Sequence, residues 1–128
     1  MKLILDTHTF IWWDSEATKL STRVLELCQD VNHTLILSVA SVWEMQIKLQ
    51  LGKLKFSLPL TDIIESQRLH NRILILPIDL LHVLVLSELP SIQKDPFDRL
   101  LIAQAKCENA VIVTADPVFA NYAVPVEW

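Results

Sequence analysis

The chain has 128 residues, 52% of them hydrophobic and 20% charged, with a formal net charge of −4. Its length predicts one domain spanning residues 1–128. The negative charge argues against a protein that holds nucleic acid by bulk electrostatic attraction, so chemistry on a nucleic acid would need a metal ion or a local basic patch. Gly52 is the only glycine, which excludes a P-loop and a dinucleotide-binding fingerprint because both need several glycines.

The longest apolar run, residues 73–86, is interrupted by Pro77, Asp79 and His82. It is shorter than the about 20 residues that a membrane-spanning helix needs. The N-terminal segment reaches Asp6 after three apolar residues and lacks the features of a secretory signal. We therefore expect a cytoplasmic protein that makes no membrane contact.

Two further bulk features concern the cysteines and the hydropathy. Cys28 and Cys107 are distant in sequence and have no second Cys or His at metal-ligand spacing, so both are interpreted as free, buried thiols. The mean hydropathy of +0.36 is high for a chain of this size. Part of the apolar surface is therefore expected to be buried against a partner.

The first half of the chain alternates short apolar runs with helical periodicity. Residues 2–6 and 34–38 are typical of buried strands. A helix is predicted from Val39 to Gly52, which is placed as a C-terminal cap. Between the two strands, apolar side chains recur at helical spacing at Leu20, Val24, Leu25, Cys28 and Val31.

The second half continues this alternation. The predicted elements are helices at about 61–71, 78–89 and 95–107, strands at 73–76 and 110–116, a short helix after Pro117 and an edge strand at 123–126. Such alternation predicts an α/β fold with a parallel sheet of four to five strands, covered by helices on both faces.

Several acids fall where such a sheet would gather them. Asp6 ends the first strand, Glu44 lies in the first turns of the helix after the second strand, and Asp116 follows the fourth strand. Asp98 opens the helix that leads into the fourth strand, with Asp95 one turn before it. Ligand sites of open α/β sheets lie beyond the carboxyl ends of the strands. The four main acids can therefore reach the same edge.

Each acid also has a purely structural explanation. Asp95-Pro96 and Asp116-Pro117 match a helix N-cap followed by proline at the first helical position. Ser41 to Glu44 fits a capping box, although Ser38 is an equally good helix start. Asp6 fits a turn. Considered singly, capping or turn formation is the favoured explanation at every position.

Considered jointly, the acids favour a bound cation. A cap contributes about 1 kcal/mol, whereas two carboxylates ~6 Å apart repel by nearly ~3 kcal/mol at an effective dielectric of ~20. Magnesium or manganese suits an all-oxygen site. Zinc is disfavoured because the histidines form no ligand pair. His33, His70 and His82 are interpreted as ordinary surface or core residues, and the role of His8, two residues after Asp6, stays open.

Four motifs in order carry a family resemblance. "LDTHTFIWW", "SVASVWE" followed by "GKL", "KDPFDRLLIAQA", and "VTAD" followed by "FANYAV" resemble the PIN-domain ribonucleases, in particular VapC-type toxins of toxin-antitoxin pairs. The resemblance runs from Lys2 to about Val126. It implies a Rossmann-like α/β/α sandwich whose acidic pocket binds one or two Mg²⁺ or Mn²⁺ ions and hydrolyses single-stranded or looped RNA with metal-activated water.

The resemblance also implies roles for individual residues. The family's four acids fall on Asp6, Glu44, Asp98 and Asp116. Our own hypothesis is that Asp6 and Asp98 are the principal metal ligands, that Asp116 and Glu44 complete the site, and that Glu44 is a candidate proton acceptor. Thr114 matches the hydroxyl residue that precedes the last acid. Together with Thr114, the expected supporting residues are Asp95, Thr7 and Ser41.

RNA contacts and partners complete the expectations. Lysines near Gly52 and basic residues beside Asp98 are candidate phosphate contacts, although solvated helix ends are the favoured explanation. For three tryptophans, packing is favoured over base stacking. The resemblance further implies a homodimer and a VapB-type antitoxin, through which alone the protein would reach DNA. The candidate phosphate contacts are Lys48, Lys53, Lys55, Lys94 and Arg99, and the three tryptophans are Trp12, Trp13 and Trp43.

Two other functions remain as alternatives. A phosphoacceptor signalling module also presents acids at strand ends, but its reactive aspartate would follow the middle strand, where this chain offers only Asp79 after Pro77. A catalytically silent binding module on the same fold is the second alternative.

Overall fold

A computed structural model describes residues 1–128, and its strands form one parallel sheet. The five strands are ordered β3-β2-β1-β4-β5, and every neighbouring pair is parallel. This confirms the predicted parallel sheet and puts β1 at its centre. The strands are β1 (Lys2–Leu5), β2 (Thr34–Ser38), β3 (Leu74–Leu76), β4 (Val111–Val113) and β5 (Val126–Glu127).

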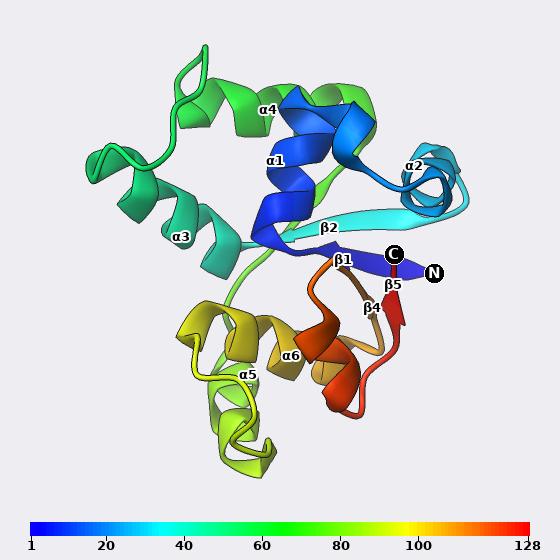
Figure 1. Ribbon diagram of the computed structural model, residues 1–128, viewed down its shortest axis with the longest axis vertical. Helices are drawn as coiled ribbons and strands as arrows, with labels where there is room; N and C mark the ends of the chain where they lie inside the picture. The colour runs from blue at the N-terminus through cyan, green and yellow to red at the C-terminus, as the bar shows by residue number, and fades with distance from the viewer.

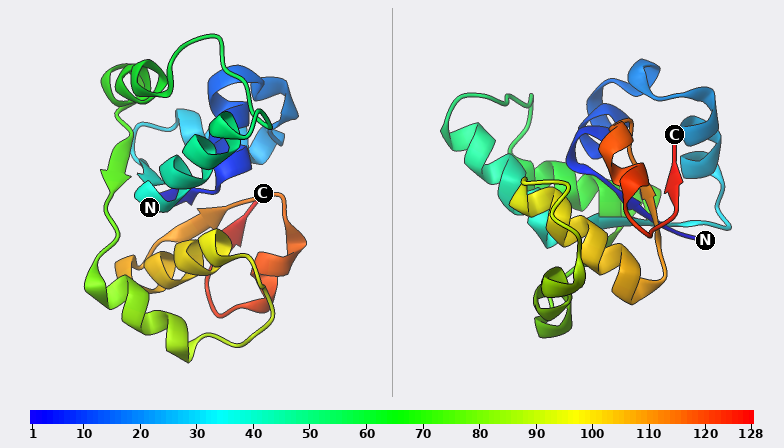
Figure 2. Two further views of the ribbon diagram at one scale, coloured as in Figure 1. Left: turned by 90° about the vertical axis from the view of Figure 1, so that its left-hand side faces the viewer. Right: turned by 60° about the horizontal axis from the view of Figure 1, so that its bottom comes forward.

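Helices cover both faces of the sheet, as Figures 1 and 2 show from three directions. One face carries α1 (Thr7–Ser15), α2 (Thr22–Gln29), α3 (Val39–Gln50) and α4 (Leu60–Asn71). The other carries α5 (Leu80–Val85) and α6 (Pro96–Glu108). Short 3₁₀ helices are η1 (Ala17–Lys19), η2 (Leu86–Glu88) and η3 (Pro117–Asn121). No helix has the length and apolar character needed to cross a membrane.

The sheet separates two hydrophobic cores because successive strand residues point to opposite faces. In β1, Leu3 and Leu5 belong to the core under α1 to α4, whereas Ile4 belongs to the core under α6. All three are fully buried. Burial on both faces explains why the strands are continuous apolar runs and lack an alternating pattern.

Helix α1 is absent from the expectations. Its sequence, THTFIWWDS, is rich in β-branched and aromatic residues, which are weak helix formers. Its apolar residues do not gather on one stripe, so no helical period is visible. The helix forms because Asp6 caps it through the backbone N of Thr9 and because Phe10 is fully buried in the core.

Several boundaries differ from those expected. Helix α2 starts after the N-cap Ser21 and ends at Gln29, which leaves Val31 outside it and 84% exposed. The helix expected at 78–89 divides into α5 and η2, and the edge strand lies at Val126–Glu127 instead of 123–126. Cys28 is buried as expected, but Cys107 is only half-buried because it lies in the last turn of α6.

The start of α3 fixes how that helix meets the rest of the fold. Ser38 is its N-cap, and the Ser38 Oγ accepts a hydrogen bond from the backbone N of Ala40 at 3.0 Å, so the alternative capping box at Ser41 to Glu44 does not form. The same hydroxyl donates to the Gln104 side chain in the middle of α6. The Gln104 amide also donates to the Pro77 carbonyl at 3.2 Å and contacts the buried core histidine His82. These bonds hold α6 against the end of β2.

Candidate active site

Asp6 lies at the carboxyl end of β1, the central strand, and both of its carboxylate oxygens accept hydrogen bonds. Oδ1 accepts from the backbone N of Thr9 at 2.9 Å, and Oδ2 accepts from the Thr114 Oγ1 at 2.6 Å. The Thr114 Oγ1 also accepts from the backbone N of Asp116 at 3.0 Å. A hydroxyl has only one proton, and here it points to Asp6. The ends of β1 and β4 are therefore joined through one threonine.

Glu44 is brought to the same edge by α3. Its Oε1 accepts a hydrogen bond from the Thr7 Oγ1 at 2.7 Å, and its Oε2 pairs with the Lys48 Nζ at 2.9 Å. Glu44 is only 9% exposed, so these partners offset the cost of burying its charge. Because Thr7 follows Asp6 in the chain, this bond places Glu44 beside the end of β1.

The start of α6 carries two aspartates with different roles. Asp95 is the N-cap, and its Oδ1 accepts from the backbone N of Phe97 at 2.8 Å and of Asp98 at 3.2 Å. The capping interpretation of Asp95 is thereby confirmed. Asp98 makes no cap, and its Oδ2 accepts one hydrogen bond, from the Gln93 amide at 3.2 Å. Its carboxylate therefore has a single hydrogen-bond partner.

The electrostatics of Asp98 reveal the neighbourhood of the acids. Burial, and after it the negative charges of Asp95, Glu44, Asp6 and Asp116, together raise the pKa of its carboxyl to about 7. The repulsion between two charges falls with their separation, so these four carboxylates must lie around Asp98. The fold thus gathers the acids that the sequence placed at separate strand ends.

The carboxylates of the site are spaced more widely than the ligands of a metal ion held by protein atoms alone. No three His, Cys, Asp or Glu side chains lie close enough together to hold a metal ion between them. Mg²⁺, however, keeps several of its waters and takes only one or two carboxylates directly. The acids offer oxygen donors alone, and the fully buried Ser41 hydroxyl, one turn before Glu44, has no hydrogen-bond partner. These residues fit a hard cation with its water shell.

One family profile matches nearly the whole chain. The sequence profile described as the PIN domain matches residues 3–125. The chain belongs to the PIN-domain family. A search of curated protein sequences gave no significant match.

Solved structures with the same fold come from several bacteria. VapBC2 from Rickettsia felis, crystallised bound to a DNA fragment from its promoter, superposes with a TM-score of 0.71 at 19% identity, covering 99% of this chain and 98% of that chain. DNA-bound VapBC from Salmonella typhimurium gives 0.69 at 16% identity, with 99% and 97% covered. FitAcB from Neisseria gonorrhoeae gives 0.60 at 23% identity, with 97% and 95% covered. At such identities the likeness concerns the fold alone.

The basic residues of this PIN domain differ in how freely they can meet a ligand. Lys53, Lys55 and Lys94 are exposed, whereas Lys48 is half-buried and paired with Glu44. Arg99 is engaged inside the protein, because its guanidinium donates to the carbonyls of Pro90 at 2.9 Å and Leu86 at 3.2 Å. It holds the loop before α6 in place.

Gln93 is a residue of this PIN domain that the sequence did not single out. Its backbone N donates to the Tyr122 Oη at 2.6 Å, and its side-chain Oε1 accepts from the backbone N of Lys94 at 3.0 Å and of Asp95 at 3.3 Å. Its amide nitrogen donates to Asp98. Gln93 thus orders the loop and holds Asp98 at once. A lone glutamine in a loop gives no sequence signal for such a role.

Gln93→Ala is expected to lower the free energy of unfolding by about 1–2 kcal/mol, because it removes one charge-assisted hydrogen bond and two bonds that order the loop. Chemical denaturation measures the effect. Gln46→Ala, on the exposed side of α3, is the matched control and should change stability by less than about 0.5 kcal/mol. Equal stability of the two variants would show that Gln93 does not hold the loop.

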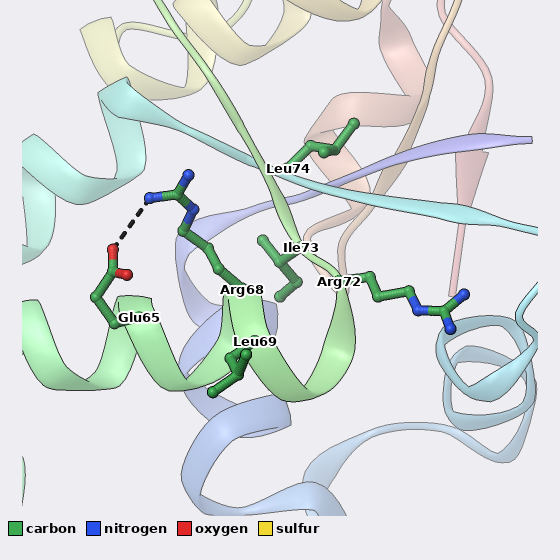
Figure 3. A pocket seen from close by; sticks show the side chains of 6 residues that line it. All are labelled: Glu65, Arg68, Leu69, Arg72, Ile73 and Leu74. Carbon is green, nitrogen blue, oxygen red and sulfur yellow. Dashed lines mark hydrogen bonds and ion pairs between the residues drawn. The ribbon is translucent and has the colours of Figure 1, made fainter.

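A hollow at the junction of α4 and β3 is remote from the acids, since it opens near the amino ends of the strands (Figure 3). Arg68 and Arg72 line it, but Arg68 pairs with Glu65 at 3.0 Å and the two guanidinium groups point away from each other. They therefore do not form a joint anion site. None of the predicted site residues lines this hollow.

Proposed function

We propose that residues 1–128 act as a single PIN domain that is an Mg²⁺- or Mn²⁺-dependent endoribonuclease, the toxin of a VapBC-type pair. The observation that carries the proposal is the convergence of acids on Asp98, whose pKa is raised to about 7 by burial and by four neighbouring carboxylates. Negative charges gathered around one half-buried carboxylate repel one another, and a bound cation would offset that repulsion. Phosphodiester hydrolysis is the chemistry that such a cation supports best.

Each acid has its own part in this proposal. Asp98 and Asp6 hold the ion: Asp98 has only one other partner, and Asp6 keeps free lone pairs on oxygens that Thr9 and Thr114 already orient. Asp116 and Glu44 complete the site. A bound Mg²⁺ or Mn²⁺ would supply positive charge at the phosphate and lower the pKa of a water molecule.

The supporting residues act by orientation. Thr7 donates a hydrogen bond to Glu44, Thr114 donates one to Asp6, and Asp95 caps the start of α6. The Ser41 hydroxyl, fully buried and without a hydrogen-bond partner, stays a supporting residue one turn before Glu44. Lys53 and Lys94 are the exposed cations best suited to phosphates, whereas Lys48 and Arg99 are engaged within the protein.

The proposed partners follow from the same assignment. The relatives from Rickettsia felis and Salmonella typhimurium were crystallised as VapBC assemblies with DNA, which supports a VapB-type antitoxin that alone brings the toxin to DNA. Exposed leucines on α5, Leu80, Leu81 and Leu84, are 74%, 60% and 58% exposed, and apolar surface of this kind supports a homodimer or the antitoxin interface. The proposed compartment is the cytoplasm, where RNA and free thiols occur together.

The test uses the purified protein, freed of any antitoxin, with structured RNAs in Mg²⁺, in Mn²⁺ and in EDTA. We expect cleavage at single-stranded or loop positions that requires the divalent ion. Cleavage that persists in EDTA would contradict the metal dependence. Failure to cut any RNA in either metal would contradict the ribonuclease assignment, and labelling of a single aspartate by a phosphodonor would favour the signalling alternative.

A further inference from the structure

A second hollow, of about 330 Å³, opens directly beside the proposed metal-binding acids. It is lined by Asp6 and Asp116 and by two aromatic side chains of α1, His8 and Trp12. Its size is at the lower end of the range for small-molecule pockets. The remaining lining residues are Ala115, between β4 and η3, and Pro117, the first residue of η3.

The aromatic pair has the arrangement of a binding wall. His8 and Trp12 lie one helical turn apart, with ring centroids 6.0 Å apart and planes inclined by 45°. The His8 side chain is exposed and makes no hydrogen bond or ion pair, so the fold does not need its imidazole. Trp12 is half-buried and braced by an edge contact with Trp128 at 5.9 Å. Trp12 is therefore a fixed wall that loses little entropy when a ligand stacks on it.

Lys19, in η1, brings a positive charge to the Trp12 ring. The Lys19 Nζ lies 5.9 Å from the centroid of the Trp12 ring and pairs with Glu16 at 2.8 Å. Both partners of this ion pair are about half exposed, and such surface pairs contribute little to stability. Lys19 can therefore exchange Glu16 for a phosphate at little cost.

Asp6 and Asp116 line the hollow together with the aromatic rings of His8 and Trp12, and Lys19, in η1 after α1, lies over the Trp12 ring. Single-stranded RNA is recognised by stacking of its unpaired bases on aromatic rings, including Trp and His, while cations follow its backbone. A phosphodiester at the acids would put the neighbouring base within the hollow and the next phosphate towards Lys19. A duplex would hold that base in its own stack and away from Trp12.

We propose that this hollow is a nucleobase subsite, in which the unpaired base next to the scissile phosphate stacks on Trp12 with His8 at its edge. The proposal rests on the ribonuclease function proposed above and adds to it a binding site for one base of the single-stranded or looped RNA. His8 and Trp12 become specificity-determining residues, and Lys19 anchors the following phosphate.

The test combines an abasic scan of the RNA with variants of the wall. With the wild-type protein and Mg²⁺, one abasic position next to the cut is expected to raise KM about 5- to 100-fold, the range for losing one stacked base. Trp12→Leu should raise KM similarly for the intact RNA and remove most of the abasic penalty. Trp12→Phe, which retains an aromatic ring, should retain the abasic penalty. His8→Ala should weaken binding less, whereas His70→Ala, an exposed histidine on α4, is the matched control and should have no effect.

A second readout is independent of cleavage. In Asp98→Asn protein with Mg²⁺, a short single-stranded RNA should quench tryptophan fluorescence, and Trp12→Leu should remove that quenching. Cleavage by the wild type with an abasic penalty that persists in Trp12→Leu would overturn the subsite and leave the hollow to a protein segment. Quenching that depends on Trp12 without any cleavage would uphold the subsite and refute the ribonuclease function. The absence of both would refute both.

Discussion

Asp6→Asn and Asp98→Asn are each expected to lower the rate of RNA cleavage at least about 100-fold, which corresponds to about 2.7 kcal/mol of lost transition-state stabilisation. Each change removes one negative oxygen from the proposed ion site. Asparagine at position 6 can still accept from the Thr9 backbone N, and its amide can donate to the Thr114 hydroxyl, so the fold should survive. Initial rates in Mg²⁺ measure the effect.

The matched control for these variants is Asp62→Asn. Asp62 is an exposed acid in the first turn of α4, outside the acidic cluster. Its replacement should leave the cleavage rate within about twofold of wild type, since surface changes of this kind alter free energies by less than about 0.5 kcal/mol. Cleavage above one third of the wild-type rate in Asp6→Asn or Asp98→Asn would contradict the proposed site.

The metal-free protein is expected to lose stability as pH rises from about 4 to about 7. The folded-state pKa of Asp98 is about 7, whereas the ordinary value is 3.8. Between these values the folded protein retains a proton that the unfolded chain has released, so its stability falls with rising pH and this contribution is gone above pH 7. Asp98→Asn should remove this pH dependence and raise the free energy of unfolding at pH 8 by about 1–3 kcal/mol, allowing for partial solvation of the carboxyl.

Denaturation in EDTA at a series of pH values checks this expectation. Wild type and Asp98→Asn should have nearly equal stability at pH 4 and diverge at pH 8. Mg²⁺ should stabilise the wild type most at pH 8, because the ion competes with the proton for the same carboxylate and binds only the folded state. Parallel stability curves for the two proteins would show that Asp98 does not carry the raised pKa.

Local rules explain what could be predicted about the helix ends. A cap depends on the cap residue and the backbone two or three positions ahead of it, so the cap at Asp95 followed from "DPFD" alone. Gly52 adopts a φ of 72°, as its place after α3 predicted. The parallel sheet followed from the alternation of short apolar runs with helical periods, and each of these is a property of neighbouring positions.

The pattern of apolar residues did not predict those elements whose formation depends on packing against residues distant in sequence. Helix α1 has no apolar stripe and forms around the buried Phe10. The boundary of β5 depends on its pairing with β4, because an edge strand exists only where a neighbour offers hydrogen bonds. Neither the order of the strands nor the position of β1 at the centre can be derived from local periodicity.

By itself, the sequence determined an α/β fold with acids near the ends of its strands, and from these acids it led to the proposal of a bound hard cation. Only the tertiary structure decided how they are held: Thr114 binds Asp6 from 108 residues away, Thr7 binds Glu44 from 37, and Gln93 reaches Asp98 from a loop without a motif. The His8–Trp12 hollow likewise needs β4 and η3 beside α1. The physical reason is the sequence separation of the residues involved. Helix caps and apolar periodicity depend on residues a few positions apart, whereas a binding site is made by distant segments that only packing brings together.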